Sequence, residues 1–252
     1  MYGWENTVLQ VFTVALLTDL ATGLGVLPFV FVKNNMSKRW QGIASAVAGG
    51  MMISASVFSL ANEAIVHGSV LEAVAGMLAG ALFFTQVANR VENNNWQIGN
   101  LSASDSKQAI LILTAMFIHS IPEGVAIGVG YATGDLRFGI LLALAIAVHN
   151  IPEGIAITLP LYTRGISLWK CSWFAILTSV PQPVLAVPSF LLVSVFKVLL
   201  PFGLGFAGGA MIYLVVSELI PNSLSGCSKE ETAWGVMVGL VLMLLITSGL
   251  GL

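Results

Sequence analysis

Charged side chains are scarce in this sequence of 252 residues. Lysine, arginine, aspartate and glutamate make up 9% of it and hydrophobic residues 57%, whereas soluble domains carry about 25% charged and about 45–50% apolar residues. This composition excludes an ordinary water-soluble domain. The formal net charge is −2, so we expect no basic surface that would bind nucleic acid.

Cysteine is also rare. Two cysteines, Cys171 and Cys227, in a chain of this length do not form a disulfide framework, and we interpret both as incidental. Residues 1–10 lack the basic segment that precedes the apolar core of a signal peptide. The first apolar run is therefore predicted to be a membrane helix and not a cleaved leader.

Long apolar runs fill the rest of the sequence. A helix needs about 20 mostly apolar residues to cross a bilayer, and polar breaks divide the chain into eight such runs. The sequence therefore predicts an all-α integral membrane protein with a single transmembrane domain over residues 1–252. The predicted spans are residues 6–32, 41–66, 70–90, 108–131, 136–162, 171–196, 201–221 and 233–251. The longest polar stretch, residues 89–107, is expected to be a flexible loop between the third and fourth spans.

The basic residues predict the orientation of these spans. Eight of them lie in or beside the odd-numbered loops, and two lie in the even-numbered loops. The eight are Lys33, Lys38, Arg39, Arg90, Lys107, Arg164, Lys170 and Lys229, and the two are Arg137 and Lys197. Because cytoplasmic loops carry the excess of lysine and arginine, both termini are expected outside the cytoplasm.

A polar motif occurs twice inside the predicted spans. The fourth span contains His119-Ser-Ile-Pro-Glu-Gly and the fifth contains His149-Asn-Ile-Pro-Glu-Gly, thirty residues later. Ionisable groups near the centre of a membrane helix cost about 2.5–3.5 kcal/mol each. Four of them in two spans require a partner or a function, and a bound cation supplies both.

The spacing of the motif supports a cation site. Histidine and glutamate four residues apart lie on one face of a helix, so each motif offers two ligands to one ion. Pro122 and Pro152 lack an N–H group and are expected to break each helix locally beside its histidine. Consecutive spans run antiparallel, so the two motifs should face each other about a pseudo-twofold axis at the membrane midplane. Imidazole and carboxylate ligands suit zinc, iron, manganese or cobalt better than calcium or magnesium.

Other polar residues give weaker signals. Glu63 and Glu218 lie near span ends and are candidates for the ion path or an accessory site. His67, at a span end, is expected to be a surface residue. Gln182 lies between two prolines in the sixth span, where the helix is expected to break again.

The alternative interpretation of the doubled motif is a pair of His–Glu contacts that only hold the helices together.

At these residues the sequence resembles the ZIP (Zrt/Irt-like) metal transporter family, in particular its bacterial GufA-like branch. The resemblance extends over nearly the whole chain. It rests on the doubled motif, on Ser-Val-Pro-Gln-Pro at residues 179–183 and on Gly-Ala-Met-Ile-Tyr-Leu-Val-Val-Ser-Glu-Leu-Ile-Pro at residues 209–221. It implies an eight-helix bundle with both termini outside the cytoplasm and an assembly that is frequently a homodimer. It also implies uptake of zinc or a related divalent ion into the cytoplasm by an elevator-like movement. We expect the protein in the cell (inner) membrane.

The resemblance also assigns ligands. His119, Glu123, His149 and Glu153 correspond to the principal metal site of the family. A neighbouring second site would draw on Ser120, Asn150 and Gln182. The family commonly has Asn at the first of these positions, and some members have Asp at the second and Glu at the third. We therefore expect one metal site rather than two. No prosthetic group is expected, because the metal ion is the cargo.

Two other functional classes remain open at this stage. An intramembrane metalloenzyme could use the same ligands with one open position for water, but it needs a general base, and the sequence has no His-Glu-x-x-His motif. A metal sensor would bind the ion without moving it. Measurable flux separates a carrier from both alternatives.

Overall fold

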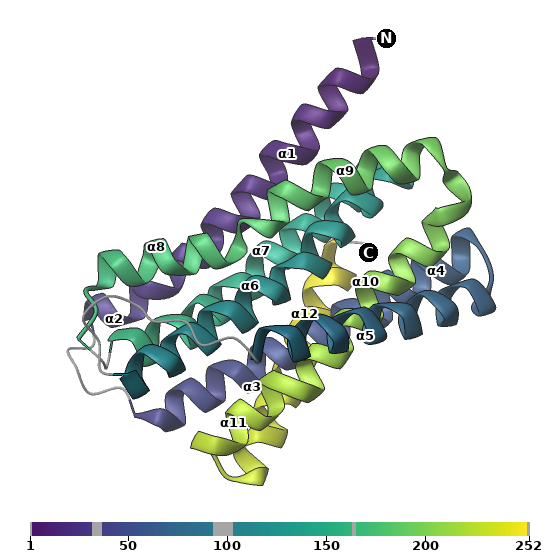
Figure 1. Cartoon of the computed structure of the whole chain (residues 1–252). Coiled ribbons are helices and arrows are strands. Elements are labelled where there is room, and N and C mark those ends of the chain that lie inside the picture. Colours follow the sequence, from purple (N-terminus) through teal and green to yellow (C-terminus); the bar gives the residue numbers. More distant parts are fainter. Residues whose placement is uncertain (1, 32–36, 93–102, 163–164, 251–252) are drawn as a thin grey trace.

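The computed structural model describes residues 2–31, 37–92, 103–162 and 165–250, and all regular elements in these ranges are helices (Figure 1). Helices suit an apolar chain, because lipid cannot satisfy backbone polar groups. The α-helices are α1 (Tyr2–Thr22), α2 (Leu27–Phe31), α3 (Lys38–Ser54), α4 (Asn62–His67), α5 (Val70–Glu92), α6 (Ala103–Ala132), α7 (Leu136–Tyr162), α8 (Leu168–Ser179), α9 (Pro181–Val195), α10 (Leu200–Leu214), α11 (Ile220–Gly226) and α12 (Lys229–Leu250). Short helical segments of other kinds are η1 (Gly23–Val26), η2 (Ala55–Ala61), η3 (Lys197–Leu199) and η4 (Val215–Leu219).

Six stretches of the described chain are long and apolar enough to cross a membrane. They coincide with the first, second, fifth, sixth, seventh and eighth predicted spans. The stretches are Thr7–Phe31, Lys38–His67, Leu136–Thr158, Leu168–Val195, Lys197–Gly226 and Lys229–Gly249. The all-helical prediction is confirmed, whereas the third and fourth spans, in α5 and α6, stay predictions. Of the predicted loop over residues 89–107, the two ends are helical, and residues 93–102 lie outside the described ranges.

The predicted helix breaks have two different outcomes. The expected local breaks at Pro122 and Pro152 are wrong, because α6 and α7 run on through them. Packing against neighbouring helices lets a membrane helix tolerate the missing hydrogen bond. The break in the sixth span is confirmed, since α8 ends at Ser179 and α9 begins at Pro181.

Two segments are π-helical, which the sequence does not predict. The segment η2 joins α3 to α4, and η4 joins α10 to α11. A π-helical turn holds more residues than an α-helical turn, and such turns are frequent at functional sites. Glu63 follows the first of these segments closely, and Glu218 lies within the second.

Glycine brings one set of helices into backbone contact. In this set α5 packs along α10 and α3 packs along α12 (Figure 1). A Cβ atom added to Gly80 of α5 would lie 2.0 Å from the carbonyl oxygen of Phe206, and one added to Gly239 of α12 would lie 2.0 Å from that of Val47. Only a residue without a side chain permits this approach. We call α3, α5, α10 and α12 the outer set.

A second set, which we call the inner set, consists of α1, α6, α7, α8 and α9. Its helices also meet through glycine. A Cβ on Gly128 of α6 would lie 2.1 Å from the carbonyl oxygen of Ala186 in α9, and one on Gly154 of α7 would lie 2.0 Å from that of Thr22 in α1. The two sets meet where α3 contacts α7 and where α10 contacts α6. The doubled motif therefore lies on the inner-set helices α6 and α7, next to the outer set.

Candidate metal centre

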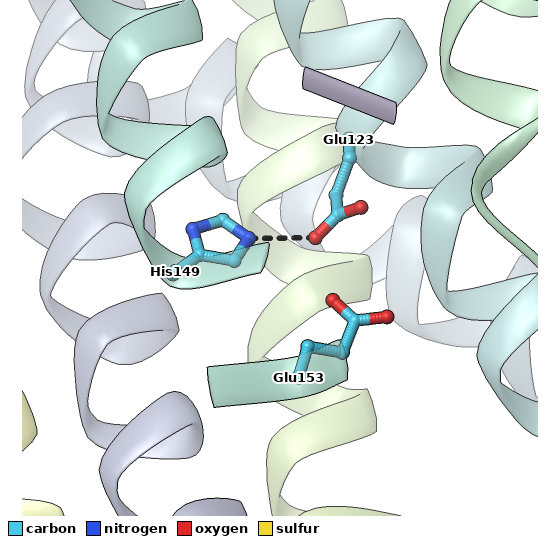
Figure 2. A group of neighbouring side chains, drawn as sticks. All are labelled: Glu123, His149 and Glu153. Atoms are coloured by element: carbon cyan, nitrogen blue, oxygen red, sulfur yellow. Dashed lines mark hydrogen bonds and ion pairs between the residues drawn. The ribbon is translucent and has the colours of Figure 1, made fainter. Parts of the chain in front are cut away.

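Three ionisable side chains converge in the interior of the bundle (Figure 2). Glu123 comes from α6, and His149 and Glu153 come from α7. One ligand atom from each lies within 4.8 Å of the other two, and the three residues are no more than 1% exposed. His149 is the middle residue of the 27-residue helix α7, which agrees with a site near the midplane of a bilayer.

The hydrogen-bond pattern leaves this cluster able to bind a cation. His149 Nε2 lies 2.7 Å from Glu123 Oε1 (Figure 2), and His149 Nδ1 has no hydrogen-bond partner in the described part of the chain. Among the described side chains, two buried carboxylates lie beside one imidazole, and buried negative charge is costly unless a cation or protons compensate it. One nitrogen and two carboxylate groups form the ligand set that borderline divalent transition metals prefer.

Gln182 fixes the second oxygen of Glu123. Its Nε2 donates to Glu123 Oε2 at 2.6 Å. Its Oε1 accepts from Thr18 Oγ1 at 2.7 Å and from Asn150 Nδ2 at 3.2 Å. Asn150 Nδ2 also donates to the carbonyl oxygen of Thr18 at 2.9 Å. Because the NH₂ group of Asn150 faces Gln182 Oε1, the Gln182 amide presents its own NH₂ group to the carboxylate, and the network joins α1, α6, α7 and α9.

The structure gives the predicted ligands different surroundings. It brings Glu123, His149 and Glu153 into one cluster. Gln182 and Asn150 border the cluster through the hydrogen bonds above, whereas the buried Ser120 hydroxyl donates to the carbonyl of Met116 in its own helix at 3.2 Å.

The three remaining predicted residues lie apart from this cluster or outside the described side chains. The backbone of His119 lies in α6, but its side chain is outside the described residues. Glu63 lies in α4, where it pairs with His67, and Glu218 lies half-buried in η4. Neither glutamate belongs to the three-residue cluster.

Thr18 is the site residue that sequence reasoning missed. It lies 164 positions from Gln182 in sequence, its hydroxyl contacts Gln182 Oε1 and its carbonyl accepts from Asn150. The available signal was a polar stretch inside the first predicted span, Thr18-Asp19 to Thr22. A threonine in a membrane helix often bonds its own backbone. Thr18 Oγ1 lies 2.7 Å from the carbonyl oxygen of Ala15 as well as 2.7 Å from Gln182 Oε1, and its single proton donates to one of them at a time. The polar stretch therefore does not distinguish a local bond from a distant one.

Comparison with known proteins gives consistent results. The family model described as ZIP zinc transporter matches residues 92–247. The zinc transporter GufA of Myxococcus xanthus is 36% identical over 248 residues, which cover 94% of this chain and 97% of that protein. A candidate zinc transporter of Arabidopsis thaliana is 40% identical over 247 residues, but the chain spans only 39% of its length. The human zinc transporter ZIP11 is 36% identical over 162 residues, or 61% of this chain and 47% of that protein.

Proposed function

Because this chain belongs to the ZIP zinc transporter family, we propose that it carries a divalent transition-metal cation, with zinc as the first candidate, through a lipid bilayer toward the cytoplasm. The observation that supports this function most directly is the buried cluster of Glu123, His149 and Glu153 on two long apolar helices. The family membership favours a transporter over an enzyme. The cation is cargo, and the proposal requires no prosthetic group.

In this proposal the cation exchanges its water for protein ligands at the centre. His119, Glu123, His149 and Glu153 bind it directly, and of these four the structure describes the last three as one cluster. Gln182 and Asn150 act through hydrogen bonds, and we propose no ligand role for Ser120, whose hydroxyl bonds its own helix. One ion is bound at a time, because Gln182 already donates to the second oxygen of Glu123.

Release of the ion on the other side requires movement, and we propose that the inner set shifts as a unit against the outer set. Contacts within each set bring backbone against backbone, as at Gly154 and Gly80. At Gly203 of α10, by contrast, the atoms nearest to an added Cβ all belong to side chains, with Val129 Cγ2 of α6 at 3.2 Å. Side-chain contacts can rearrange between two packings more easily than fitted backbones, which supports sliding between the sets.

The membrane arrangement belongs to the same proposal. We propose eight spans in one transmembrane domain, with α5 and α6 as the third and fourth spans beside the six apolar stretches. α6 and α7 would then run antiparallel, both termini would face away from the cytoplasm, and the protein would lie in the cell (inner) membrane as a homodimer. The orientation was predicted from the distribution of lysine and arginine over the loops. Two of these basic residues, Lys33 and Arg164, lie outside the described residues.

A native cysteine tests the orientation. Cys227 is half-buried between α11 and α12, on the predicted cytoplasmic side, whereas Cys171 is fully buried. Burial, helped by the charge of Glu231, raises the pKa of the Cys227 thiol, so labelling should be run at alkaline pH. A membrane-impermeant maleimide is expected to label the protein only after the cells are permeabilised, and a Cys227→Ser variant should not be labelled at all. Labelling of Cys227 in intact cells would reverse the proposed orientation.

Replacing Gln182 by leucine is expected to weaken zinc binding about 10-fold to 100-fold, the usual effect of removing a hydrogen bond that orients a ligand. The change removes the donor to Glu123 Oε2 and leaves that oxygen free to turn away. Titration calorimetry on the purified protein measures the affinity. Gln86→Leu, at an exposed glutamine of α5, is the matched control. Equal affinities in the two variants would show that Gln182 only fills space.

Zinc flux into proteoliposomes containing the purified protein tests the function as a whole. Saturable uptake supports a carrier. Tight zinc binding without flux of any divalent transition metal would instead favour a sensor that uses the same ligands.

A further inference from the structure

Each of the three histidines in this chain has a glutamate four residues away. Two of these pairs, at His119 and His149, belong to the motif of the proposed metal centre. The third pair is Glu63 and His67, in reverse order. With only 12 acidic residues in 252, the third pair deserves an explanation, and the mechanism above does not use it.

The structure brings the third pair into contact. Glu63 and His67 lie one turn apart on α4, with 3.2 Å between His67 Nε2 and Glu63 Oε2. Their side chains are 26% and 33% exposed, respectively, unlike the fully buried central cluster. A hydrated ion can therefore reach this pair without any movement of the helices.

The pair lies at one end of the bundle. After His67 the chain turns at Gly68, where an added Cβ would lie 2.3 Å from Pro201 Cγ at the start of α10. Just before α10, Lys197 Nζ donates to the carbonyl oxygen of Ala132, the last residue of α6. These contacts connect the end of α4 to the end of α6. Glu123 lies nine residues before Ala132, or about 13.5 Å along the helix.

The chemistry of the pair fits a metal ion. An imidazole nitrogen and a carboxylate oxygen on adjacent turns are the ligand types of the central cluster, and they prefer the same borderline divalent ions. An exposed His–Glu contact stabilises a helix only slightly, so folding alone does not account for it. Among the described residues, only the central cluster gathers three such ligands, so water must complete the coordination at Glu63 and His67 and the affinity must be low.

We propose that Glu63 and His67 form an outer, low-affinity site for the same divalent transition metal that the central site carries. This inference rests on the proposed function. In the proposed orientation the outer site faces away from the cytoplasm, so it captures hydrated ions at the bundle end nearest Glu123. Weak binding suits this role, because an ion held tightly at the entrance would not move inward.

A binding experiment isolates the outer site. In a background with all four proposed ligands of the central site replaced (His119→Gln, Glu123→Gln, His149→Gln and Glu153→Gln), Co²⁺ titrated into the purified full-length protein should still give the visible absorption of a histidine-ligated ion. Adding His67→Gln should abolish this absorption, and adding Glu63→Gln should weaken it. Glu230→Gln is the matched control, because this exposed carboxylate lies on α12. Absence of the absorption, or its persistence without His67, would refute the outer site.

Transport kinetics give a second, separate test. In an otherwise native chain, His67→Gln removes one of the two protein ligands and should raise the KM for zinc flux about tenfold, which corresponds to about 1.4 kcal/mol of binding free energy. The maximal rate should be unchanged. An unchanged KM would show that the pair does not capture the transported ion. If the native protein shows no flux, the proposed function fails, while the Co²⁺ titration still decides whether Glu63 and His67 bind metal.

Discussion

The double substitution Glu123→Gln and Glu153→Gln is expected to reduce zinc flux in proteoliposomes to background while the protein stays folded. It removes both carboxylates from the central cluster and leaves His149 as its one described ligand. Loss of a hydrogen bond behind a metal ligand already costs 10–100-fold in affinity, so the loss of two direct ligands should cost more than about 100-fold. Flux of radioactive zinc, measured with and without a zinc gradient, gives the result.

The fold should survive this change for a physical reason. Glutamine keeps the size of glutamate and carries no charge, so the variant no longer buries two carboxylates that are at most 1% exposed. Its thermal unfolding temperature should equal or exceed that of the native protein. Glu72→Gln with Glu230→Gln is the matched control, since it also removes two carboxylates, one half-buried and one exposed, that lie outside the cluster. Normal zinc flux in the Glu123→Gln, Glu153→Gln variant would show that the transport site lies elsewhere in the protein.

Gly154→Ala is expected to disrupt the inner set and eliminate zinc binding, although it adds a single methyl group. The new Cβ would lie 2.0 Å from the carbonyl oxygen of Thr22, and the backbone of Gly25 lies against the same glycine. Neither neighbour is a flexible side chain that can turn aside, so α1 must move away from α7. Overpacking in a protein core typically costs about 1–3 kcal/mol, and backbone contacts place this site at the upper end of that range.

The same displacement reaches the metal centre. Thr18 lies one turn before Thr22 on α1 and contacts both Gln182 and Asn150. A shift of α1 therefore removes the network behind Glu123. Thermal unfolding and zinc calorimetry should both report the loss, whereas Gly249→Ala, where an added Cβ meets nothing within 4 Å, should be neutral. A Gly154→Ala protein with native stability and affinity would show that α1 and α7 do not pack as described.

The centre was largely predictable because its chemistry is encoded locally. Histidine and glutamate four residues apart can be recognised in any helix, and their repetition inside apolar spans indicates a shared ion. The spans were predictable for a related reason, since the length of an apolar run depends only on neighbouring residues. Glu123, His149 and Glu153 lie in one cluster as the motif predicts, and six of the predicted spans match apolar helical stretches.

Features that depend on distant partners could not be predicted. The roles of Thr18 and Gln182 arise from contacts across 164 positions, and no periodicity reports such a pairing. The prolines of the motif gave a wrong prediction for a similar reason. A local rule says that Pro122 breaks its helix, but α6 is held by packing along α9, where Gly128 meets the carbonyl of Ala186.

The π-helical segment η2 sets the angular phase of everything that follows it on the same helix. An α-helix advances about 100° per residue, and the wide π-helical turn accommodates about one residue more than an α-helical turn. If the same residues Ala55–Ala61 adopted α-helical winding, α4 would rotate by about 100° relative to α3. Glu63 and His67 would keep their mutual contact but point in a new direction. A change from π-helical to α-helical hydrogen bonding between Ser54 and Asn62 can therefore re-aim the outer pair without altering a single residue of the sequence.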